Sequence, residues 1–386
     1  MRILKTKNGE GYVWLAVLVL FLSLLTSVLL LYLTLCGQVL NERRERKQAL
    51  DSYLAEFAKA SYDAIRQGDG YLDLMEGTYR INPLEPKRWA DAISKEDADC
   101  PDAFRERAVL DQHISFLRDF FRAYKDFTDP QLDAIGILLT KLYENFGIGR
   151  TADFSDLRPT DYPILSDLYS LAEEEYKQAE DGEAPLFTRE LLREICLGLH
   201  SMCVGNESRF FNGHTNLTDS RFLTFGVKGL IDTNRKLRDA MLFNILSYMN
   251  HRLLTDGNTV ASIDEAYLFL SNLTTIEYIR NAMKRVRKKN SAVLLASQNI
   301  DDFLAPDVRE YTKPLFAIPA NRFLFYPGHV EQRDFCDALS ISPAEYALID
   351  HPERGVCLYH CGNARYLLQV QAPEFQAKLF GDAGGR

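Results

Sequence analysis

The chain opens with a long apolar run. Residues 13–36 contain no charged side chain, and at about 1.5 Å per helical residue they can cross the roughly 30 Å hydrocarbon layer of a membrane. A cleaved signal peptide usually has an apolar part of only about 7 to 15 residues. We therefore expect a tail over residues 1–12 and one uncleaved transmembrane helix over 13–36. Three basic side chains precede this run and four follow it, so the flanking charges leave its orientation open.

Apolar residues then recur at helical spacing. Leu50, Leu54 and Phe57 fall on one helical face, and the pattern predicts an amphipathic stalk or linker over residues 37–70 that ends near Gly68. A single anchor followed by a stalk resembles the amino-terminal part of pilin-like and TadE-like proteins.

Two further patterns follow along the chain. Helical periodicity over about residues 100–205 predicts an all-helical subdomain. From about residue 206 to 386, short apolar runs alternate with helical stretches, which indicates a parallel sheet covered by helices. The helices are expected over 237–253 and 267–289. Strands are expected at residues 71–75, 221–230, 259–263, 292–297, 314–318, 322–326, 355–360 and 365–370, the last two as a hairpin.

Polar side chains follow two neighbouring strands of this predicted sheet. Asp264 and Glu265 come directly after one apolar run, and Gln298 follows the next. Ligands of open parallel sheets bind beyond the carboxyl ends of the strands. In nucleotide motors one such carboxylate holds Mg²⁺, a second polarises the attacking water, and a polar side chain senses the γ-phosphate. The alternative is that the acidic pair begins the next helix, at the positive end of the helix dipole.

A basic run lies between these two strand ends. Six of the ten side chains over residues 280–289 are Lys or Arg. One interpretation makes Arg285 or Arg287 an arginine finger that reaches a nucleotide in a neighbouring subunit, or places the run against DNA. The other is a solvated helix end, where cations suit the negative dipole terminus.

The composition narrows the classes of function. The net charge is −9 although the first 50 residues hold seven basic and only three acidic side chains. An acidic body argues against nonspecific DNA binding through overall charge. The seven cysteines include no Cys-x-x-Cys pair, which argues against a disulfide scaffold and a zinc ribbon. The sequence also lacks the Gly-x-Ser-x-Gly and His-Glu-x-x-His motifs of serine hydrolases and zinc proteases.

Several short motifs, taken together and in order, resemble one family. They are Tyr79-Arg80-Ile81-Asn82-Pro83-Leu84, Asn212-Gly213-His214-Thr215-Asn216, Asp264-Glu265-Ala266-Tyr267, Arg285-Val286-Arg287-Lys288-Lys289-Asn290 and Ala296-Ser297-Gln298-Asn299. The set resembles the conjugal-transfer motor ATPases of type IV secretion systems, the TraE/TraC/TrbE (VirB-four) family. The resemblance covers roughly residues 70–386. It implies an α/β fold over residues 71–386, a RecA-like P-loop NTPase core with an all-α insertion.

The resemblance also implies roles for individual residues. Asp264 would be the Walker B carboxylate that holds Mg²⁺, Glu265 the catalytic base and Gln298 the sensor, all three at the ATP site. It further implies a homo-oligomer, namely a hexamer, contact with other secretion-apparatus subunits and the membrane, and indirect contact with the transferred DNA. Because ATP is cytosolic, we expect a single-pass protein of a bacterial cell membrane with its body in the cytoplasm.

One part of the family pattern is missing. The phosphate-binding loop (Walker A) needs Gly-x-x-x-x-Gly-Lys-Ser/Thr, and these 386 residues contain no Gly-Lys dipeptide. In the family this loop precedes the motif at residues 79–84, where this chain has its stalk and apolar run. We therefore expect the carboxyl-terminal part of such an ATPase, with an incomplete core joined near Gly68 to the anchor and with impaired hydrolysis. The alternatives are a non-catalytic membrane-anchored assembly or scaffold subunit of a secretion apparatus, or a pilin-like envelope protein with its body outside.

Overall fold

The computed structural model describes most of the body of the chain. The described residues are 70–87, 102–149, 154, 157–180, 186–217, 220, 222–270, 272–298 and 300–380, together with Arg44 and Lys59. The chain divides into two units, Gly68–Gln371 and Met1–Gln67 with Ala372–Arg386. The predicted anchor over residues 13–36 and nearly all of the predicted stalk lie outside the described residues. Within the described part, no helix combines the length and apolarity that crossing a membrane requires.

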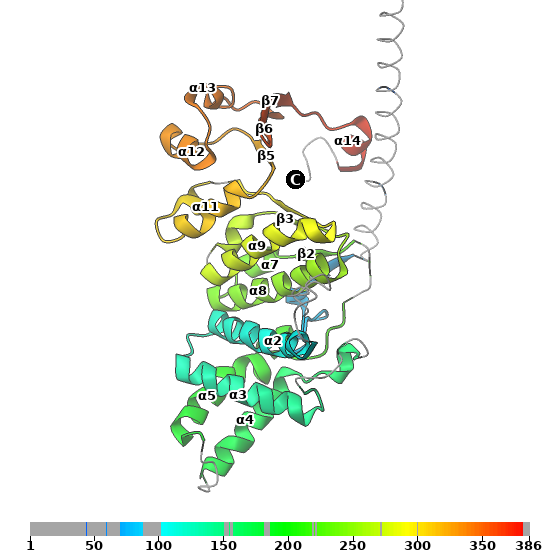
Figure 1. Ribbon diagram of the computed structural model, residues 1–386, viewed down its shortest axis with the longest axis vertical. Coiled ribbons are helices and arrows are strands. Elements are labelled where there is room, and N and C mark those ends of the chain that lie inside the picture. Colours follow the sequence, from blue (N-terminus) through cyan, green and yellow to red (C-terminus); the bar gives the residue numbers. More distant parts are fainter. Residues whose placement is uncertain are drawn as a thin grey trace, which may run out of the picture. The chain divides into compact units, whose positions relative to one another are not determined.

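The region predicted to be helical is helical in the structure. Its described part holds α2 (Asp102–Tyr124), α3 (Asp129–Asn145), α4 (Leu165–Glu180) and α5 (Arg189–Cys203), the cyan and green helices of Figure 1. Phe116, Phe120 and Phe121 form an aromatic stripe along α2 and are almost fully buried. They belong to one apolar core that also includes residues of α3, α4 and α5. The aromatic stripe is therefore core.

The remainder of Gly68–Gln371 alternates strands with mostly shorter helices. In chain order these are β1 (Tyr71–Asp73), α6 (Ser208–Phe211), β2 (Thr224–Gly226), α7 (Lys228–Ile231), α8 (Arg235–His251), β3 (Val260–Ile263), α9 (Leu273–Arg285), β4 (Ala292–Leu295), α10 (Asp301–Leu304), α11 (Arg309–Ala317), β5 (Asn321–Leu324), α12 (Gln332–Leu339), α13 (Pro343–Tyr346), β6 (Val356–Cys361) and β7 (Ala364–Gln369). Single turns of 3₁₀-helix lie at Leu74–Glu76, Pro159–Asp161, Ala266–Phe269 and Val286–Lys289, and a π-helical turn lies at Arg252–Asp256. In the other unit the structure describes α14 (Glu374–Phe380).

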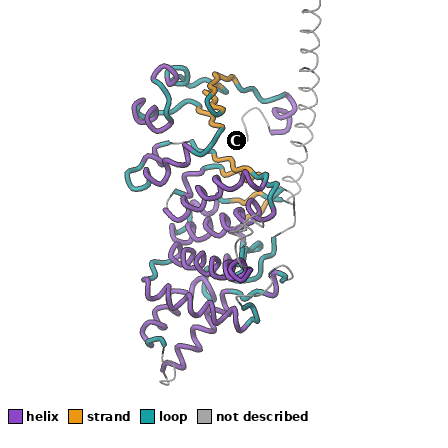
Figure 2. The backbone as a smooth tube through the Cα atoms, viewed as in Figure 1, coloured by secondary structure: helices purple, strands orange, loops and turns teal. Residues whose placement is uncertain are grey.

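The described strands form small sheets rather than one wide sheet (Figure 2). β1 pairs in parallel with β2, and β3 pairs in parallel with β4. β5, β6 and β7 form an antiparallel sheet in which β6 and β7 are the predicted hairpin. The parallel pairing was predicted correctly, but the described parallel strands form two separate pairs and not one sheet. Residues along β3 alternate between exposed and buried, so one face of this strand points away from the core.

One predicted strand is a helix. Residues 314–318, predicted as a strand from their apolar run, form the end of α11 instead. Val308, Thr312 and Leu315 are buried at helical spacing along this segment, and the Thr312 hydroxyl donates a hydrogen bond of 2.5 Å to the carbonyl of Phe303. The helical face that contacts the core therefore decides the structure, and the short apolar run does not.

Two other predicted elements have different bounds. The strand predicted over 221–230 shortens to β2, because α7 begins at Lys228. The helix predicted over 267–289 is interrupted. α9 begins at Leu273, and the side chain of its N-cap residue Asn272 accepts a hydrogen bond from the backbone N of Thr274. An Asn at this position satisfies a backbone donor that would otherwise lack a partner at a helix start.

Candidate functional site

The carboxyl ends of β3 and β4 meet at one rim. The two strands are parallel and in register, with Val260 opposite Ala292 and Ile263 opposite Leu295. Backbone hydrogen bonds extend this pairing beyond the strands, since the N–H of Ala296 donates to the carbonyl of Ile263 at 2.9 Å. The structure therefore brings the acidic pair after β3 and the amide after β4 to the same edge, as the sequence predicts.

The side chains of Gln298 and Glu265 contact each other at this rim. Gln298 Nε2 donates a hydrogen bond to Glu265 Oε1, with 2.5 Å between the two atoms. Glu265 is also the residue that precedes the 3₁₀ turn Ala266–Phe269, but its side chain makes no capping hydrogen bond to that turn. Glu265 thus stands at the start of this turn, as the alternative has it, while its side chain contacts Gln298 and not the backbone of the turn.

Asp264 is exposed beside this pair. One of its carboxylate oxygens accepts a hydrogen bond from the backbone N of Glu265 at 3.0 Å, and the side chain is open to solvent. Magnesium is held in nucleotide sites by one or two carboxylates, with water and phosphate oxygens completing its six ligands. Among the described residues no group of three acidic, His or Cys side chains could hold a metal. A single exposed carboxylate such as that of Asp264 could supply one ligand to an Mg²⁺ ion that phosphate and water oxygens otherwise hold.

Glu265 has an unusual backbone conformation. Its φ of 50° and ψ of 48° lie in the left-handed region, which costs a residue with a Cβ about 1–2 kcal/mol. The other described non-glycine residues with positive φ are Asn258, Asn290 and Ser340, and Asn tolerates this region well. Such strain is concentrated at functional sites, where the surrounding structure holds it in place. Here it accompanies a turn that directs the Glu265 side chain toward β4.

The two candidate arginines lie at the other end of β4. Arg285 is the last residue of α9 and Arg287 lies in the turn Val286–Lys289, so both precede the strand whose far end leads to Gln298. Both side chains are exposed. Four strand residues at about 3.3 Å each separate them from the rim. The structure does not bring these arginines to the acidic pair of the same chain.

The two earlier motifs pack against each other instead of joining the rim. The backbone N of Arg80 donates to Asn216 Oδ1 at 2.6 Å, and the backbone N of Asn82 donates to Thr215 Oγ1 at 3.0 Å. Asn82 is fully buried, and its Nδ2 donates to the carbonyl of Pro163 at 2.9 Å. These motifs therefore join distant segments of the body and contribute to its stability.

Sequence reasoning missed a buried polar cluster beside this junction. Lys87 exposes only 4% of its side chain, and its Nζ lies 3.0 Å from Glu85 Oε2. The Thr215 hydroxyl donates a hydrogen bond to the same carboxylate. Burial lowers the pKa of Lys87, and the charge of Glu85 opposes this shift. His113 of α2 is fully buried, and desolvation lowers its pKa to about 3, so its ring is neutral.

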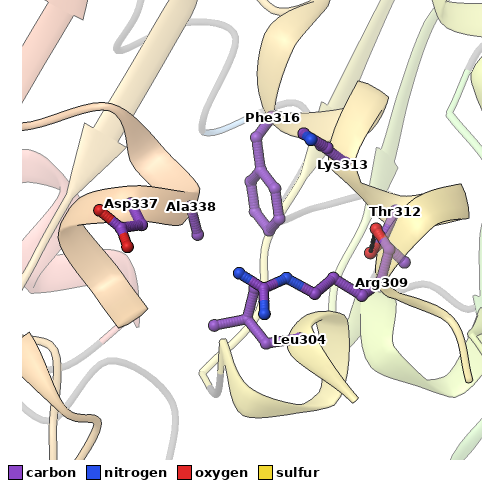
Figure 3. Close-up of a pocket in the computed structure, with 7 residues that line it drawn as sticks. All are labelled: Leu304, Arg309, Thr312, Lys313, Phe316, Asp337 and Ala338. Carbon is purple, nitrogen blue, oxygen red and sulfur yellow. Dashed lines mark hydrogen bonds between the residues drawn. The ribbon is translucent and has the colours of Figure 1, made fainter. Parts of the chain in front are cut away.

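Two cavities in the described part of the chain lie outside the rim. One of about 250 Å³ is lined by residues that include Arg238, Tyr267 and Asp302. The other, of about 220 Å³, lies between α11 and α12, and its lining includes Arg309, Phe316 and Ala338 (Figure 3). Neither cavity is lined by the acidic pair or by Gln298.

Comparison with known proteins shows which of them this chain resembles. No family model matches the chain. The second portion of a probable conjugal transfer protein TrbE from Sinorhizobium fredii is 34% identical over 116 residues, which are 29% of this chain and 17% of that relative. The match thus spans only about a sixth of the relative's length. The structure of VirB4 from Thermoanaerobacter pseudethanolicus superposes with a TM-score of 0.69 and 26% identity, covering 82% of this chain and 80% of that one.

The chain is therefore similar in structure to VirB4 and, over a short stretch, in sequence to a TrbE protein. The resemblance predicted from the short motifs is thereby confirmed, and the chain corresponds to the carboxyl-terminal part of such a protein. The structural match also supports the predicted fold class, a RecA-like α/β core with helical additions. The rim that holds Asp264, Glu265 and Gln298 thus belongs to a VirB4-like body.

Proposed function

We propose that this VirB4-related chain is a subunit of an ATP-driven motor for conjugal transfer or type IV secretion. In this proposal Asp264, Glu265 and Gln298 are its contribution to the nucleotide site. The observation that supports it most directly is the hydrogen bond between Gln298 and Glu265 at the ends of two paired parallel strands. Structural likeness to VirB4 over most of the chain adds to this support.

Each of the three side chains has a distinct task in this mechanism. Bound Mg-ATP supplies the phosphoanhydride bond and the charge of the metal. Asp264, exposed at the rim, would hold the metal through a hard carboxylate oxygen. Glu265 orients the attacking water and accepts its proton. Gln298 positions the Glu265 carboxylate through its amide N–H and senses the γ-phosphate.

The remaining contribution to catalysis is the phosphate cradle. In P-loop enzymes backbone N–H groups and a lysine stabilise the charge that develops on the phosphate oxygens. The 386 residues contain no Gly-Lys dipeptide. We therefore expect the chain by itself to bind Mg-ATP weakly and to hydrolyse it at close to the uncatalysed rate.

Calorimetric titration of the purified full chain with Mg-ATP tests this function. We expect measurable binding that Asp264→Asn weakens about tenfold, which corresponds to about 1.4 kcal/mol, because the metal loses a charged ligand. Glu310→Gln, a change at an exposed carboxylate of α11, is the matched control and should bind as the unmodified chain does. Fast hydrolysis that disappears in Glu265→Gln would contradict the expected impairment.

A scaffold subunit is the second candidate. The observation that favours it is the same lack of a Gly-Lys dipeptide, since a body that needs only its oligomer surface does not need a phosphate cradle. In that case the titration with Mg-ATP gives no heat of binding at any concentration. The result of this one titration therefore separates the motor from the scaffold.

The motor proposal extends to a hexamer in which Arg285 or Arg287 acts on the nucleotide of a neighbouring subunit. Two observations support this extension. The side chains of Arg285 and Arg287 are exposed, and both residues lie at the end of β4 that is away from the rim of their own chain. Calorimetric titration of Arg287→Ala with Mg-ATP tests it. The variant should bind Mg-ATP more weakly than the unmodified chain at protein concentrations where the chain forms oligomers, and equally well where it is a monomer.

We also propose that the protein is a single-pass protein of the bacterial cell membrane with its body in the cytoplasm, in contact with other secretion-apparatus subunits and indirectly with the transferred DNA. The charge-free residues 13–36 support the membrane span, and the need for cytosolic ATP supports the orientation. A reporter enzyme that is active only in the cytoplasm, fused to the carboxyl terminus, tests the orientation. Activity of the reporter supports a cytoplasmic body, and an inactive reporter supports the alternative of an envelope protein with its body outside.

A further inference from the structure

The cavity of about 220 Å³ between α11 and α12 has an apolar and a charged side (Figure 3). Pockets for drug-sized ligands occupy about 300–1,000 Å³, so this cavity suits a small group and not a whole nucleotide. Its apolar lining comes from Leu304, Phe316 and Ala338, and its charged lining from Arg309, Lys313 and Asp337.

The helices that line this cavity are fixed against one another. Thr312 of α11 is fully buried, and its hydroxyl donates a hydrogen bond of 2.5 Å to the carbonyl of Phe303 on α10. The ring centroids of Phe303 and Phe316 are 5.4 Å apart, and Phe316 also packs against the apolar cluster that contains Phe335 of α12. The lining side chains therefore start from a rigid framework, as a binding site requires.

Two cations on α11 lie at this cavity in an unfavourable arrangement. Arg309 and Lys313 are one helical turn apart, and like charges at this spacing repel each other. Arg309 is also the first residue of α11, where the helix dipole disfavours a positive charge. Neither side chain forms an ion pair with a residue in the part of the chain that the structure describes. Asp337 pairs instead with Arg333, with 4.0 Å between Oδ2 and Nε. An anion in the cavity would offset this repulsion.

The two cations suit a phosphate group better than a carboxylate. A phosphate monoester carries roughly −1.5 to −2 charges at pH 7, which matches one guanidinium and one ammonium, whereas a carboxylate carries a single charge. A guanidinium binds two phosphate oxygens at once, and a lysine adds a point charge. The apolar side of the cavity keeps water away, which strengthens the attraction between opposite charges.

We propose that the cavity between α11 and α12 is a binding site for a dianionic phosphate. Arg309 and Lys313 bind its oxygens, and Phe316 lines the apolar side of the site. The phosphate is either inorganic or the terminal phosphate of a lipid head group, which share this chemistry. The site is separate from the nucleotide rim, because neither the acidic pair nor Gln298 lines it.

Calorimetric titration of the full chain with inorganic phosphate tests this site, in a detergent that carries no phosphate group. Lys313→Gln should weaken phosphate binding at least about tenfold, because one of the two cations is lost. Lys125→Gln changes an exposed lysine directly after α2. It is the matched control and should bind phosphate as the unmodified chain does. Acetate at the same ionic strength should compete at least about tenfold more weakly than phosphate, because it carries one charge.

Urea unfolding separates a binding role of Lys313 from a structural one. Without phosphate, Lys313→Gln should unfold at the same urea concentration as the unmodified chain or a higher one, because the repulsion with Arg309 is removed. Phosphate should then shift the unfolding of the unmodified chain to higher urea, since it binds the folded state, and should leave Lys313→Gln unchanged. A lysine that only supported the fold would lower the stability of the variant in both conditions.

The proposal is overturned if phosphate does not bind, if acetate competes as well as phosphate, or if Lys313→Gln and Lys125→Gln bind phosphate equally. It is also overturned if Lys313→Gln weakens the binding of Mg-ATP as much as that of phosphate, because the phosphate then lies at the rim. Titration with dihexanoyl phosphatidic acid, a soluble lipid, distinguishes the two sources. Tighter binding than that of inorganic phosphate identifies a lipid head group as the ligand, and equal or weaker binding identifies free phosphate.

Discussion

Gln298 donates a hydrogen bond to Glu265 across 33 positions of sequence. The two residues meet because β3 and β4 run in the same direction and in register. An antiparallel pairing of the same two strands would place Gln298 at the opposite end of the sheet from the acidic pair. The direction of one strand pairing therefore creates the candidate site.

The left-handed conformation of Glu265 predicts a conflict between stability and function. Replacing Glu265 with Gly removes the Cβ that makes this conformation unfavourable, a gain of about 1–2 kcal/mol. The greater freedom of Gly in the unfolded chain offsets roughly 0.5–1 kcal/mol of it. We expect Glu265→Gly to unfold in urea with a free energy equal to, or up to about 1.5 kcal/mol above, that of the unmodified chain.

Glu174→Gly is the control for this variant. Glu174 is an exposed residue of helix α4, where a change to Gly costs about 1 kcal/mol. A loss of stability in Glu265→Gly as large as that in Glu174→Gly would show that the conformation of Glu265 carries no strain. Titration of the stabilised variant with Mg-ATP then shows whether it has lost function.

Asn82 predicts a large stability loss away from the rim. Its buried side chain donates to the carbonyl of Pro163 and accepts from the backbone N of Leu84 at 3.0 Å. Asn82→Ala leaves both backbone groups without a partner in the core, which should lower the free energy of unfolding by roughly 2–4 kcal/mol. Asn321→Ala, at an exposed residue whose Oδ1 accepts from the Tyr359 hydroxyl, should change it by less than about 0.5 kcal/mol.

The candidate site was predictable from sequence because it depends only on the residues at two strand ends and on the direction in which the strands pair. Two apolar runs end in polar residues, and parallel pairing alone is enough to place Asp264 and Gln298 at one edge. The prediction failed at residues 314–318 for a different reason. Their apolar run fits a short strand or a helix equally well, and contacts of α11 with the core made the choice.

The buried cluster around Lys87 was not predictable in this way. Its partners come from distant positions, since Thr215 is 130 residues from Glu85 in the sequence. A charged pair two residues apart after a proline-containing turn is typical of an exposed loop. Only the packing of α2 and the loop at Thr215 over this segment makes the pair buried, and no local pattern encodes that packing.

The neutral His113 predicts a pH-dependent loss of stability. Its pKa is lowered by burial, and further by the charge of Lys87, to about 3, against about 6.5 in the unfolded chain. As the pH falls from 6.5 toward 3, the unfolded state therefore binds a proton that the folded state does not. The free energy of unfolding should fall over this window by up to about 1.4 kcal/mol per pH unit through this residue.

Comparison with His113→Leu isolates this contribution. Urea unfolding at pH 7.5, 6 and 5 should show a smaller decrease for the variant than for the unmodified chain. His329→Leu, a change at an exposed histidine, controls for the loss of an imidazole and should follow the unmodified chain. Parallel decreases in His113→Leu and the unmodified chain would refute the assignment of a neutral buried ring.

The hairpin β6–β7 depends on a glycine that precedes it. Gly355 has a φ of 80°, and a Cβ built there would lie 2.1 Å from the carbonyl oxygen of Val370. Backbone atoms on both sides prevent relief by a rotamer change, so Gly355→Ala should destabilise the β5–β6–β7 sheet by at least about 2 kcal/mol. Gly362→Ala in the turn of the same hairpin, with a φ of 57° and open space around its Cβ position, should cost only about 1 kcal/mol. Hydrogen exchange of the backbone amides of β6 and β7 measures the loss of stability in each variant. Equal protection of these amides in the two variants would show that the contact with Val370 does not constrain the hairpin.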